Sequence, residues 1–358
     1  MERTDLTRLK KCMQRALKGE ALTIGFFGGS ITQDCAATAH ENCYAYRVFQ
    51  WWEKTFPKAE LHYVNGGIGG TTSHFGVSRA AADLLMYQPD LVVVDFSVND
   101  EANEFFQETY EGLLRKILTW KSEPAVLLLN NVFYDTGKNA QEYHNAVGNW
   151  YHLPHVSIKD TVYRRMKSGM YTREELTQDG LHPNDKGHEL LAEELIAFFQ
   201  KVLADIQSQE AEAPFPEPMT ENAYEQAKRL TIREISPELL GFAADAQEKR
   251  GHLDIFKNGW IGKKPGEKII FEVTASCLAV QYRKTVAKPA LRAKLALDGD
   301  TENIRILDGS FEEDWGDCLY LEPILHHGER MEHRVEIEIL DDGKKEAAPF
   351  CLLSLIIA

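Results

Sequence analysis

Hydrophobic residues in the first 205 positions gather in short runs that alternate with longer segments of helical spacing. The runs at 23–27, 61–65, 91–96, 125–130 and 156–158 predict five buried strands. Apolar residues recur every three to four positions in the other segments, and the helices expected there cover residues 1–17, 44–56, 78–87, 109–120, 140–150 and 186–202. Strands that alternate with crossover helices predict an α/β fold with a doubly wound, five-stranded parallel sheet.

Beyond residue 222 the apolar positions recur at every second residue. This alternation predicts strands at 268–273, 277–282, 293–298, 332–340 and 350–357, separated by Gly, Pro and Asp turns. Several short antiparallel strands at this spacing predict an all-β sandwich of the jelly-roll type.

The segment between the two patterns, residues 208–218, contains the sequence Glu-Ala-Glu-Ala-Pro-Phe-Pro-Glu-Pro. Its prolines allow neither a helix nor a central strand, so it is expected to be a semi-rigid linker. The predicted organisation is a first domain at 1–207, a linker at 208–222 and a second domain at 223–358.

Ser30 follows the first predicted strand, in the sequence Gly-Gly-Ser-Ile-Thr at 28–32. The carboxyl edge of an open parallel sheet is where ligands bind, and a helix amino terminus there supplies N–H groups for a developing negative charge. Ser30 is therefore a candidate nucleophile. The same five residues also fit a tight turn in which Ser30 caps the next helix.

Asp179 and His182 stand three residues apart in the sequence Asp-Gly-Leu-His-Pro, just before the helix expected at 186–202. A serine hydroxyl needs a base to take its proton, and the base needs a carboxylate that fixes its tautomer. His182 is the candidate base and Asp179 its partner. A surface histidine beside a helix cap is the alternative.

Two further segments offer hydrogen-bond donors for an oxyanion. The glycine cluster at 66–70 follows the second strand and leaves the Gly70 N–H free to point at a substrate, while Asn99 follows the third strand with a side-chain amide. Considered separately, the glycine cluster fits an ordinary turn, and Asn99 fits a cap at the end of the strand. Taken together with the Ser30 N–H, they form an oxyanion hole.

These segments resemble the SGNH hydrolases, also called GDSL esterases and lipases, over residues 20 to 205. Ser30, Gly70, Asn99 and His182 match the four residues that name the family, and Asp179 matches its aspartate. Gly29 and Ser97 depart from the Asp and Gly that many members have in Gly-Asp-Ser and Gly-x-Asn-Asp. The sequence Gly-Gly-Ser-Ile-Thr is similar to a branch rich in carbohydrate acetylesterases.

The resemblance implies a flavodoxin-like catalytic domain that needs no metal or other cofactor. Together with the second domain, which resembles carbohydrate-binding modules, it implies a serine acetylesterase of the acetyl mannan or xylan type. The expected partner is an acetylated plant oligosaccharide, with β-mannan fragments favoured and xylan fragments next. Two alternatives stay open: a short-chain lipid esterase or lysophospholipase of the same family, and a non-catalytic carbohydrate-binding protein.

Two tryptophans of the second half are candidates for different tasks. Trp260, between Gly259 and Ile261, is expected in the sandwich core. Trp315 lies in an acidic loop, where an indole could stack on a sugar ring beside carboxylates that bind hydroxyl groups. A loop anchor is the alternative for Trp315. His144, His152 and His155 are expected to be packing or surface residues.

The net charge limits the classes of binding partner, and the cysteine content bears on the cellular location. A formal net charge of -15 with no basic run argues against a nucleic acid or an anionic membrane. No apolar stretch is long enough to span a bilayer. The six cysteines show no C-x-x-C spacing and the amino terminus shows no signal peptide pattern, so free thiols and a cytoplasmic location are expected. The oligomeric state, including a homo-oligomer, is left open.

Overall fold

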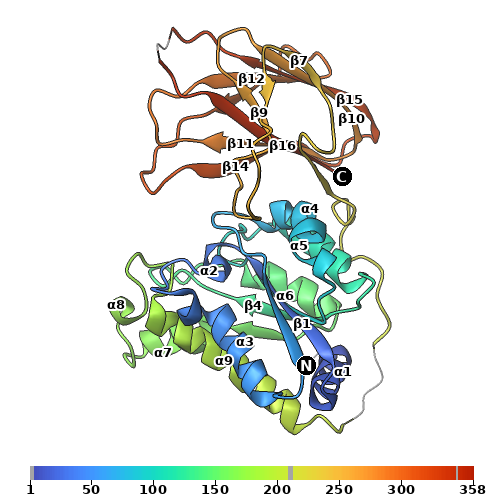
Figure 1. Ribbon diagram of the computed structural model, residues 1–358, viewed down its shortest axis with the longest axis vertical. Helices are drawn as coiled ribbons and strands as arrows, with labels where there is room; N and C mark the ends of the chain where they lie inside the picture. Colours follow the sequence, from blue (N-terminus) through green and yellow to red (C-terminus); the bar gives the residue numbers. More distant parts are fainter. Residues whose placement is uncertain (1–3, 209–212, 344–345) are drawn as a thin grey trace. The chain divides into compact units, whose positions relative to one another are not determined.

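The computed structural model describes residues 4–208, 213–343 and 346–358. The chain forms two compact units, Met1–Glu225 and Gln226–Ala358. Figure 1 labels many of their elements, which are numbered in chain order.

A five-stranded parallel sheet forms the centre of the first unit, as predicted. Its strands are β1 (Ala21–Gly28), β2 (Glu60–Asn65), β3 (Leu91–Asp95), β4 (Ala125–Asn130) and β5 (His155–Ser157). They lie in the order β2-β1-β3-β4-β5, and every neighbouring pair is parallel. This is the flavodoxin-like order, whose direction reverses between β1 and β3 and opens a crevice at the carboxyl ends of these strands.

Helices cover both faces of this sheet (Figure 1). They are α1 (Thr7–Lys18), α2 (Ser30–Gln33), α3 (Tyr44–Thr55), α4 (Ser73–Asp83), α5 (Glu104–Leu118), α6 (Gln141–Trp150), α7 (Arg164–Lys167), α8 (Arg173–Leu176) and α9 (Asp185–Ala204), with short turns η1 (His40–Asn42), η2 (Leu85–Tyr87) and η3 (Lys159–Tyr163). Successive residues of β1 face opposite sides: Phe26 joins the core formed with α1, α3 and α9, while Phe27 contacts Phe96 on the other side. The sheet is therefore buried on both faces, as its unbroken apolar strands require.

The helix predicted at 78–87 begins five residues earlier than expected and ends sooner. It is α4 (Ser73–Asp83), followed by the separate turn η2 and by Gln88 in a left-handed conformation with φ 51°. The Ser73 N–H donates to the carboxylate of Asp100 at 2.8 Å, so a side chain distant in sequence satisfies the first turn of this helix.

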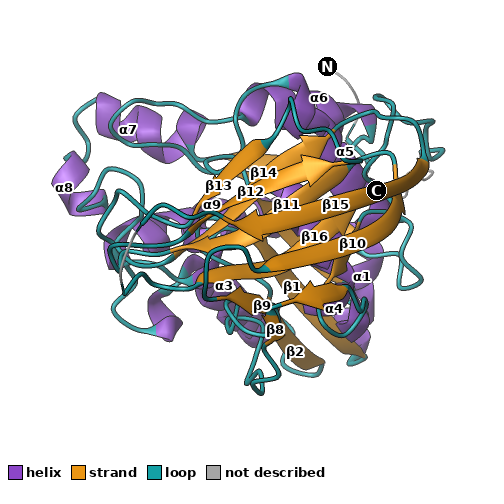
Figure 2. Ribbon diagram, turned by 90° about the horizontal axis from the view of Figure 1, so that it is seen from above, coloured by secondary structure: helices purple, strands orange, loops and turns teal. Residues whose placement is uncertain are grey.

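The second unit is a sandwich of two antiparallel sheets, as predicted, and its strands are drawn in orange in Figure 2. The strands are β6 (Lys228–Leu230), β7 (Glu238–Leu240), β8 (Ala243–Ala244), β9 (Trp260–Gly262), β10 (Lys268–Ala275), β11 (Leu278–Lys284), β12 (Arg292–Leu297), β13 (Arg305–Asp308), β14 (Cys318–Leu325), β15 (Met331–Ile339) and β16 (Phe350–Ile357). One sheet has the order β13-β12-β15-β10-β7 and the other β14-β11-β16-β9-β8, with β6 paired to β16. Trp260 is 1% exposed and packs on Phe271, so its expected place in the core is confirmed.

The described part of the predicted linker is bound to the first unit. The Thr220 N–H donates to the Glu111 carboxylate at 2.8 Å, and the Ala223 N–H donates to Glu108 at 2.9 Å. The division between the compact units accordingly falls after Glu225, three residues beyond the expected end of the linker. Residues 209–212 lie outside the described part of the chain.

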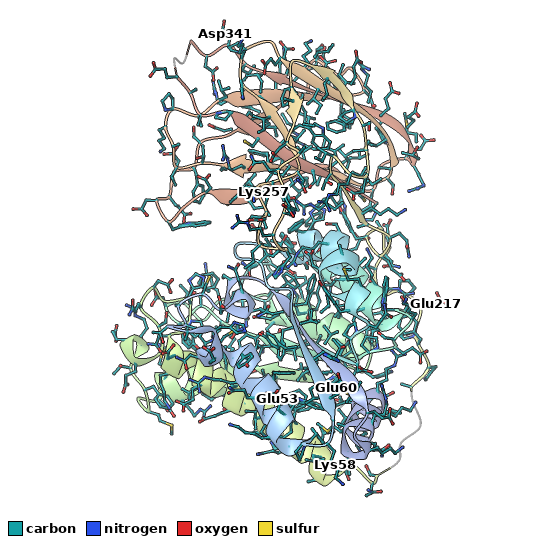
Figure 3. All side chains as sticks on the ribbon, viewed as in Figure 1. Glu53, Lys58, Glu60, Glu217, Lys257 and Asp341 are labelled. Atoms are coloured by element: carbon teal, nitrogen blue, oxygen red, sulfur yellow. The ribbon has the colours of Figure 1, made fainter. Side chains whose placement is uncertain are left out.

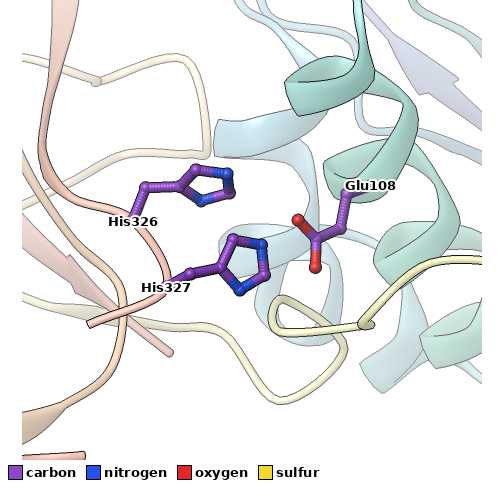
Figure 4. Close-up of side chains that lie close together, drawn as sticks. All are labelled: Glu108, His326 and His327. Carbon is purple, nitrogen blue, oxygen red and sulfur yellow. The ribbon is translucent and has the colours of Figure 1, made fainter. Parts of the chain in front are cut away.

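Figure 4 labels three side chains: Glu108 on α5 of the first unit, and His326 and His327 of the second unit. The two histidines follow β14 in the second unit, where their ring centroids are 4.1 Å apart.

Charged side chains cover the surface of the first unit; Glu53, Lys58 and Glu60 are exposed and point away from the core (Figure 3). All six cysteines are described and free, as expected. Within the described ranges, no helix combines the length and the apolar character that crossing a bilayer requires.

Candidate active site

Ser30 is the first residue of α2, directly after β1 and the pair Gly28-Gly29. The first N–H groups of a helix have no acceptor within that helix, so the Ser30 N–H is a donor at the carboxyl edge of the sheet. Gly28 is required by close packing, since a Cβ atom there would lie 2.4 Å from both the Asp95 carbonyl oxygen and the Thr32 hydroxyl. The strand therefore turns into the helix with Ser30 at the turn.

His182 and Asp179 lie on the loop before α9, whose first turn is capped by the Asn184 side chain. The Nε2 atom of His182 is 2.8 Å from Ser30 Oγ, and its Nδ1 atom is 2.6 Å from Asp179 Oδ2. The structure thus brings three residues, separated by up to 152 positions in the sequence, into one chain of hydrogen bonds.

The Asp179 carboxylate is held in its ionised form. Partial burial would raise the pKa of Asp179, but the hydrogen bond with the His182 ring and those from the Leu181 and His182 N–H groups outweigh it and lower the pKa to about 2. An ionised Asp179 accepts from Nδ1–H of His182 and leaves Nε2 to accept the proton of Ser30.

The loop that carries this pair is itself packed tightly at Gly180. Gly180 has φ 80°, and a Cβ atom there would lie 2.0 Å from Asp135 Oδ2. Its carbonyl accepts from the Tyr134 N–H at 2.7 Å. Sequence reasoning missed Asp135 and Tyr134, because they follow β4 by only a few residues and form no motif with Asp179.

The glycine loop after β2 has one unoccupied donor. The N–H groups of residues 66 to 69 donate in turn to Phe26 O, Asn65 Oδ1, Gly28 O and Gln33 Oε1, at 2.8, 2.8, 3.1 and 2.6 Å. Among the described residues none accepts from the Gly70 N–H, and Gly70 has φ 66°, which favours glycine. The donor expected from sequence is therefore available at the same strand edge as Ser30.

Asn99 lies beside the residue that precedes Ser30. A Cβ atom on Gly29 would lie 2.1 Å from Asn99 Oδ1, so any side chain at position 29 would displace the Asn99 amide. Within the described ranges, that amide donates to no protein atom. This contact gives a physical reason for glycine at position 29.

Asn99 is flanked by a buried hydrogen bond between His144 and Asp100. His144 Nε2 is 3.0 Å from Asp100 Oδ2, both side chains are at most 1% exposed, and the His144 ring stacks on Tyr110 at 3.7 Å. His144 is therefore a packing residue, as expected, and it anchors the turn that carries Asn99.

A buried arginine was missed by sequence reasoning. Arg79 on α4 donates to the carbonyl oxygens of Gly66 at 2.6 Å and Gly28 at 3.1 Å, and it pairs with Asp83 at 3.2 Å. Burial lowers the pKa of Arg79, although the Asp83 carboxylate opposes this shift. The guanidinium connects the ends of β1 and β2, where Ser30 and the glycine loop begin. In sequence, Arg79 and Asp83 look like an ordinary surface pair four residues apart on a helix.

Asp95 lies beneath the same turn and is 2% exposed. Burial raises the pKa of Asp95 to about 7, although hydrogen bonds from Asn131 at 2.8 Å and Thr32 at 3.3 Å oppose the shift. These bonds tie α2 to the ends of β3 and β4.

Trp315 belongs to the second unit, where the residue is 59% exposed. Its Nε1–H donates to Glu313 at 2.6 Å and its ring meets Phe311 edge to face at 4.9 Å. A role of Trp315 in substrate contact stays a prediction.

Comparisons with known proteins find a matching family and similar solved structures. The model of the GDSL-like lipase/acylhydrolase family matches residues 26–190. The crystal structure of a two-domain esterase (CEX) active on acetylated mannans is 47% identical in sequence, with a TM-score of 0.96, and the match covers 99% of this chain and 96% of that one. A structure of such an esterase co-crystallized with mannopentaose is also 47% identical, with a TM-score of 0.94 and coverage of 99% and 95%. The comparison with curated proteins finds no match.

The likeness extends over both units, and the family model spans the segments from the end of β1 to α9 that carry the motifs. The chain belongs to the GDSL-like lipase/acylhydrolase family and is a carboxylic ester hydrolase.

Proposed function

We propose that this protein is a serine carbohydrate acetylesterase that removes O-acetyl groups from plant-derived oligosaccharides, with β-mannan fragments favoured over xylan fragments. The observation that carries the proposal is the hydrogen-bond chain Ser30–His182–Asp179 beside three available donors. The 47% identity over 99% of the chain with an esterase active on acetylated mannans supports the choice of sugar.

In the proposed acylation step, Ser30 Oγ attacks the acetyl carbonyl carbon while its proton moves to His182 Nε2. The carbonyl oxygen becomes negatively charged and is stabilised by the Ser30 N–H, the Gly70 N–H and the Asn99 side-chain amide. When the C–O bond to the sugar breaks, His182 returns the proton to the departing sugar oxygen, which leaves as a hydroxyl group.

In the proposed deacylation step, a water molecule replaces the sugar. His182 takes one proton from the water as its oxygen attacks the acetyl-serine carbonyl, and the same donors stabilise the second oxyanion. The acetyl group leaves as acetic acid, which loses its proton to the solvent, while Ser30 regains a proton from His182. Asp179 stabilises the imidazolium in both steps.

The second unit is proposed to contribute to sugar binding through Trp315. The indole is exposed and Glu313 fixes its orientation at 2.6 Å, which suits a stacking platform for a sugar ring. Trp315→Ala should spare a small chromogenic acetate and reduce kcat/KM several-fold on acetylated oligosaccharides. Equal changes on both substrates would make Trp315 a loop anchor.

The test of the proposed function compares substrates. Acetylated manno- and xylo-oligosaccharides are analysed by mass spectrometry before and after incubation, and chromogenic acetate and octanoate esters are hydrolysed in parallel. Faster loss of acetyl from the manno-oligosaccharides and a preference for acetate are expected. A preference for octanoate would indicate a lipid esterase, and the absence of any hydrolysis would indicate a binding protein.

A further inference from the structure

Gln33, the last residue of α2, joins the nucleophile turn to the glycine loop. Its Oε1 atom accepts from the Gly69 N–H at 2.6 Å, and α2 begins at Ser30. We infer that Gln33 is a positioning residue, which sets the place of the Gly70 donor relative to Ser30. The inference rests on the proposed function, because it concerns the oxyanion hole of that site.

The glycine loop depends on anchors outside itself. Four of the five residues at 66–70 are glycines, which restrict their own backbone least of all residues. Asn65 and the Gly28 carbonyl hold the first half of the loop through the Gly67 and Ile68 N–H groups. The hydrogen bond from Gly69 to Gln33 is the last anchor before Gly70, and the Thr71 hydroxyl, which donates to the Ile68 carbonyl at 2.7 Å, is the first anchor after it. Gln33 therefore holds the side of the Gly70 peptide that faces Ser30.

The loop is also close to the nucleophile at this point. A Cβ atom on Gly69 would lie 3.6 Å from Ser30 Cβ and 3.2 Å from Gln33 Oε1. A displacement of about 1 Å in a catalytic site can cost about 100-fold in rate, because the donors are aimed at one oxygen position. Loss of the Gln33 acceptor would allow a displacement of this kind without removing any catalytic group.

The chemistry of the side chain separates positioning from direct catalysis. The carboxamide oxygen of Gln33 is the acceptor for Gly69, so a glutamate at this position retains the acceptor, whereas a methionine of similar length lacks it. Gln33 therefore affects the transition state through Gly69 and Gly70.

The experiment measures two quantities for Gln33→Met and Gln33→Glu. The first is kcat/KM for hydrolysis of a chromogenic acetate. The concentration of active enzyme is determined by titrating the active-site serine with a fluorophosphonate. The second is the inhibition constant of methylboronic acid, which adds to a serine hydroxyl and gives a tetrahedral anion that resembles the transition state. For Gln33→Met, kcat/KM should fall about 10- to 100-fold and the inhibition constant should rise by a similar factor. For Gln33→Glu, both should stay within about threefold of the parent protein.

The matched control is Gln14→Met on α1. It deletes a side-chain hydrogen bond of the same unit, from Gln14 Nε2 to the Ile206 carbonyl at 3.1 Å, and should change neither quantity. If Gln33→Met does not fold, Gln33→Ala takes its place. Three results overturn the inference: unchanged values for the methionine variant, equal losses in both Gln33 variants, or a fall in rate without weaker boronate inhibition.

Failure of the proposed function gives a different result. In that case the parent protein does not hydrolyse acetates, or Ser30→Ala remains active. If the parent protein is active and Ser30→Ala is inactive, an unaffected Gln33→Met variant rejects the positioning role alone.

Discussion

At the scale of single residues, Asp179 divides its hydrogen bonds between its two oxygens. Oδ2 pairs with the His182 ring, while Oδ1 accepts from the N–H groups of Leu181 and His182 at 2.9 and 2.8 Å. The carboxylate therefore both orients the proposed base and closes the turn on which it stands. Its low pKa gives this arrangement a measurable dependence on pH.

The stabilisation that Asp179 contributes should disappear in acid. The pKa in the folded protein is about 2, below the ordinary value of 3.8, so the folded state binds fewer protons than the unfolded state between these values. The contribution is complete above pH 3.8 and is lost as the pH falls towards 2. The melting temperature of the parent protein should exceed that of Asp179→Asn near pH 5, and the difference should shrink near pH 2. A difference that does not change with pH would contradict this.

Gly29→Ala should impair the proposed oxyanion hole through Asn99. The added methyl group would lie 2.1 Å from Asn99 Oδ1 and must displace that side chain. Asn99→Ala should lower kcat about 100- to 1000-fold, the cost of removing one oxyanion donor. Gly29→Ala should cause a large part of this loss in the parent protein and little further loss when combined with Asn99→Ala. Additive losses in the double variant would show that Gly29 acts independently of Asn99.

At the scale of elements, the ends of β1 and β2 are fixed by a side chain from α4. Arg79 donates to carbonyl oxygens at both strand ends and lies 4.2 Å from the centroid of the Phe27 ring. A lysine at this position has one nitrogen in place of the guanidinium fork and cannot reach both carbonyls in the same geometry.

Arg79→Lys should lower both stability and activity. Either the Gly66 carbonyl would lose its donor or the Gly28 carbonyl would keep only the Ile68 N–H, at a cost of up to about 1–3 kcal/mol in the free energy of unfolding. The loss is measured by urea denaturation, together with kcat for a chromogenic acetate, and Arg164→Lys on the exposed face of α7 serves as control. Unchanged stability would mean that Arg79 does not hold the two strand ends.

The elements that could be predicted from the sequence are those whose signal is local. The strands at 91–96 and 125–130 are continuous apolar runs, and the observed β3 and β4 match them to within one residue. The start of α4 could not be predicted, because Asp100 satisfies the Ser73 N–H from 27 positions away. The sequence did not predict β14, because this strand contains Pro323 and proline is rare in strand interiors.

The same distinction applies to the candidate site. Ser30, Asp179 and His182 could be identified because each stands in a short motif next to a predicted strand or helix. Gln33 and Arg79 could not, because their partners are backbone groups of loops that only the folded sheet brings near.

At the scale of the whole molecule, the limits of the catalytic unit differ from those that composition suggests. The Pro-rich segment reads as a linker, but Glu225 pairs with Arg115 at 2.7 Å and Tyr224 is 2% exposed. Glu108 and Glu111 on α5 accept backbone N–H groups from this segment. The segment at 213–225 is therefore part of the first unit.

Two truncations test this conclusion. A chain that ends after Glu225 should fold and hydrolyse a small acetate near the parent rate in the folded fraction. A chain that ends after residue 207 should be less stable, because the carboxylates of Glu108 and Glu111 lose their N–H partners. Thermal unfolding and soluble yield are compared for the two. Equal stability would show that the segment does not contribute to the unit.

The central claim is that Ser30 and His182 act together in the hydrolysis of acetyl esters. The most direct measurement is the rate of acetate release by Ser30→Ala, His182→Ala and the double variant, with folding checked by circular dichroism. Each single change should lower kcat by about 10⁴- to 10⁶-fold, and the double variant should be no slower, since residues that act as a unit are not additive. Retention of more than about a hundredth of the parent rate by Ser30→Ala, or a further large loss in the double variant, would contradict the account.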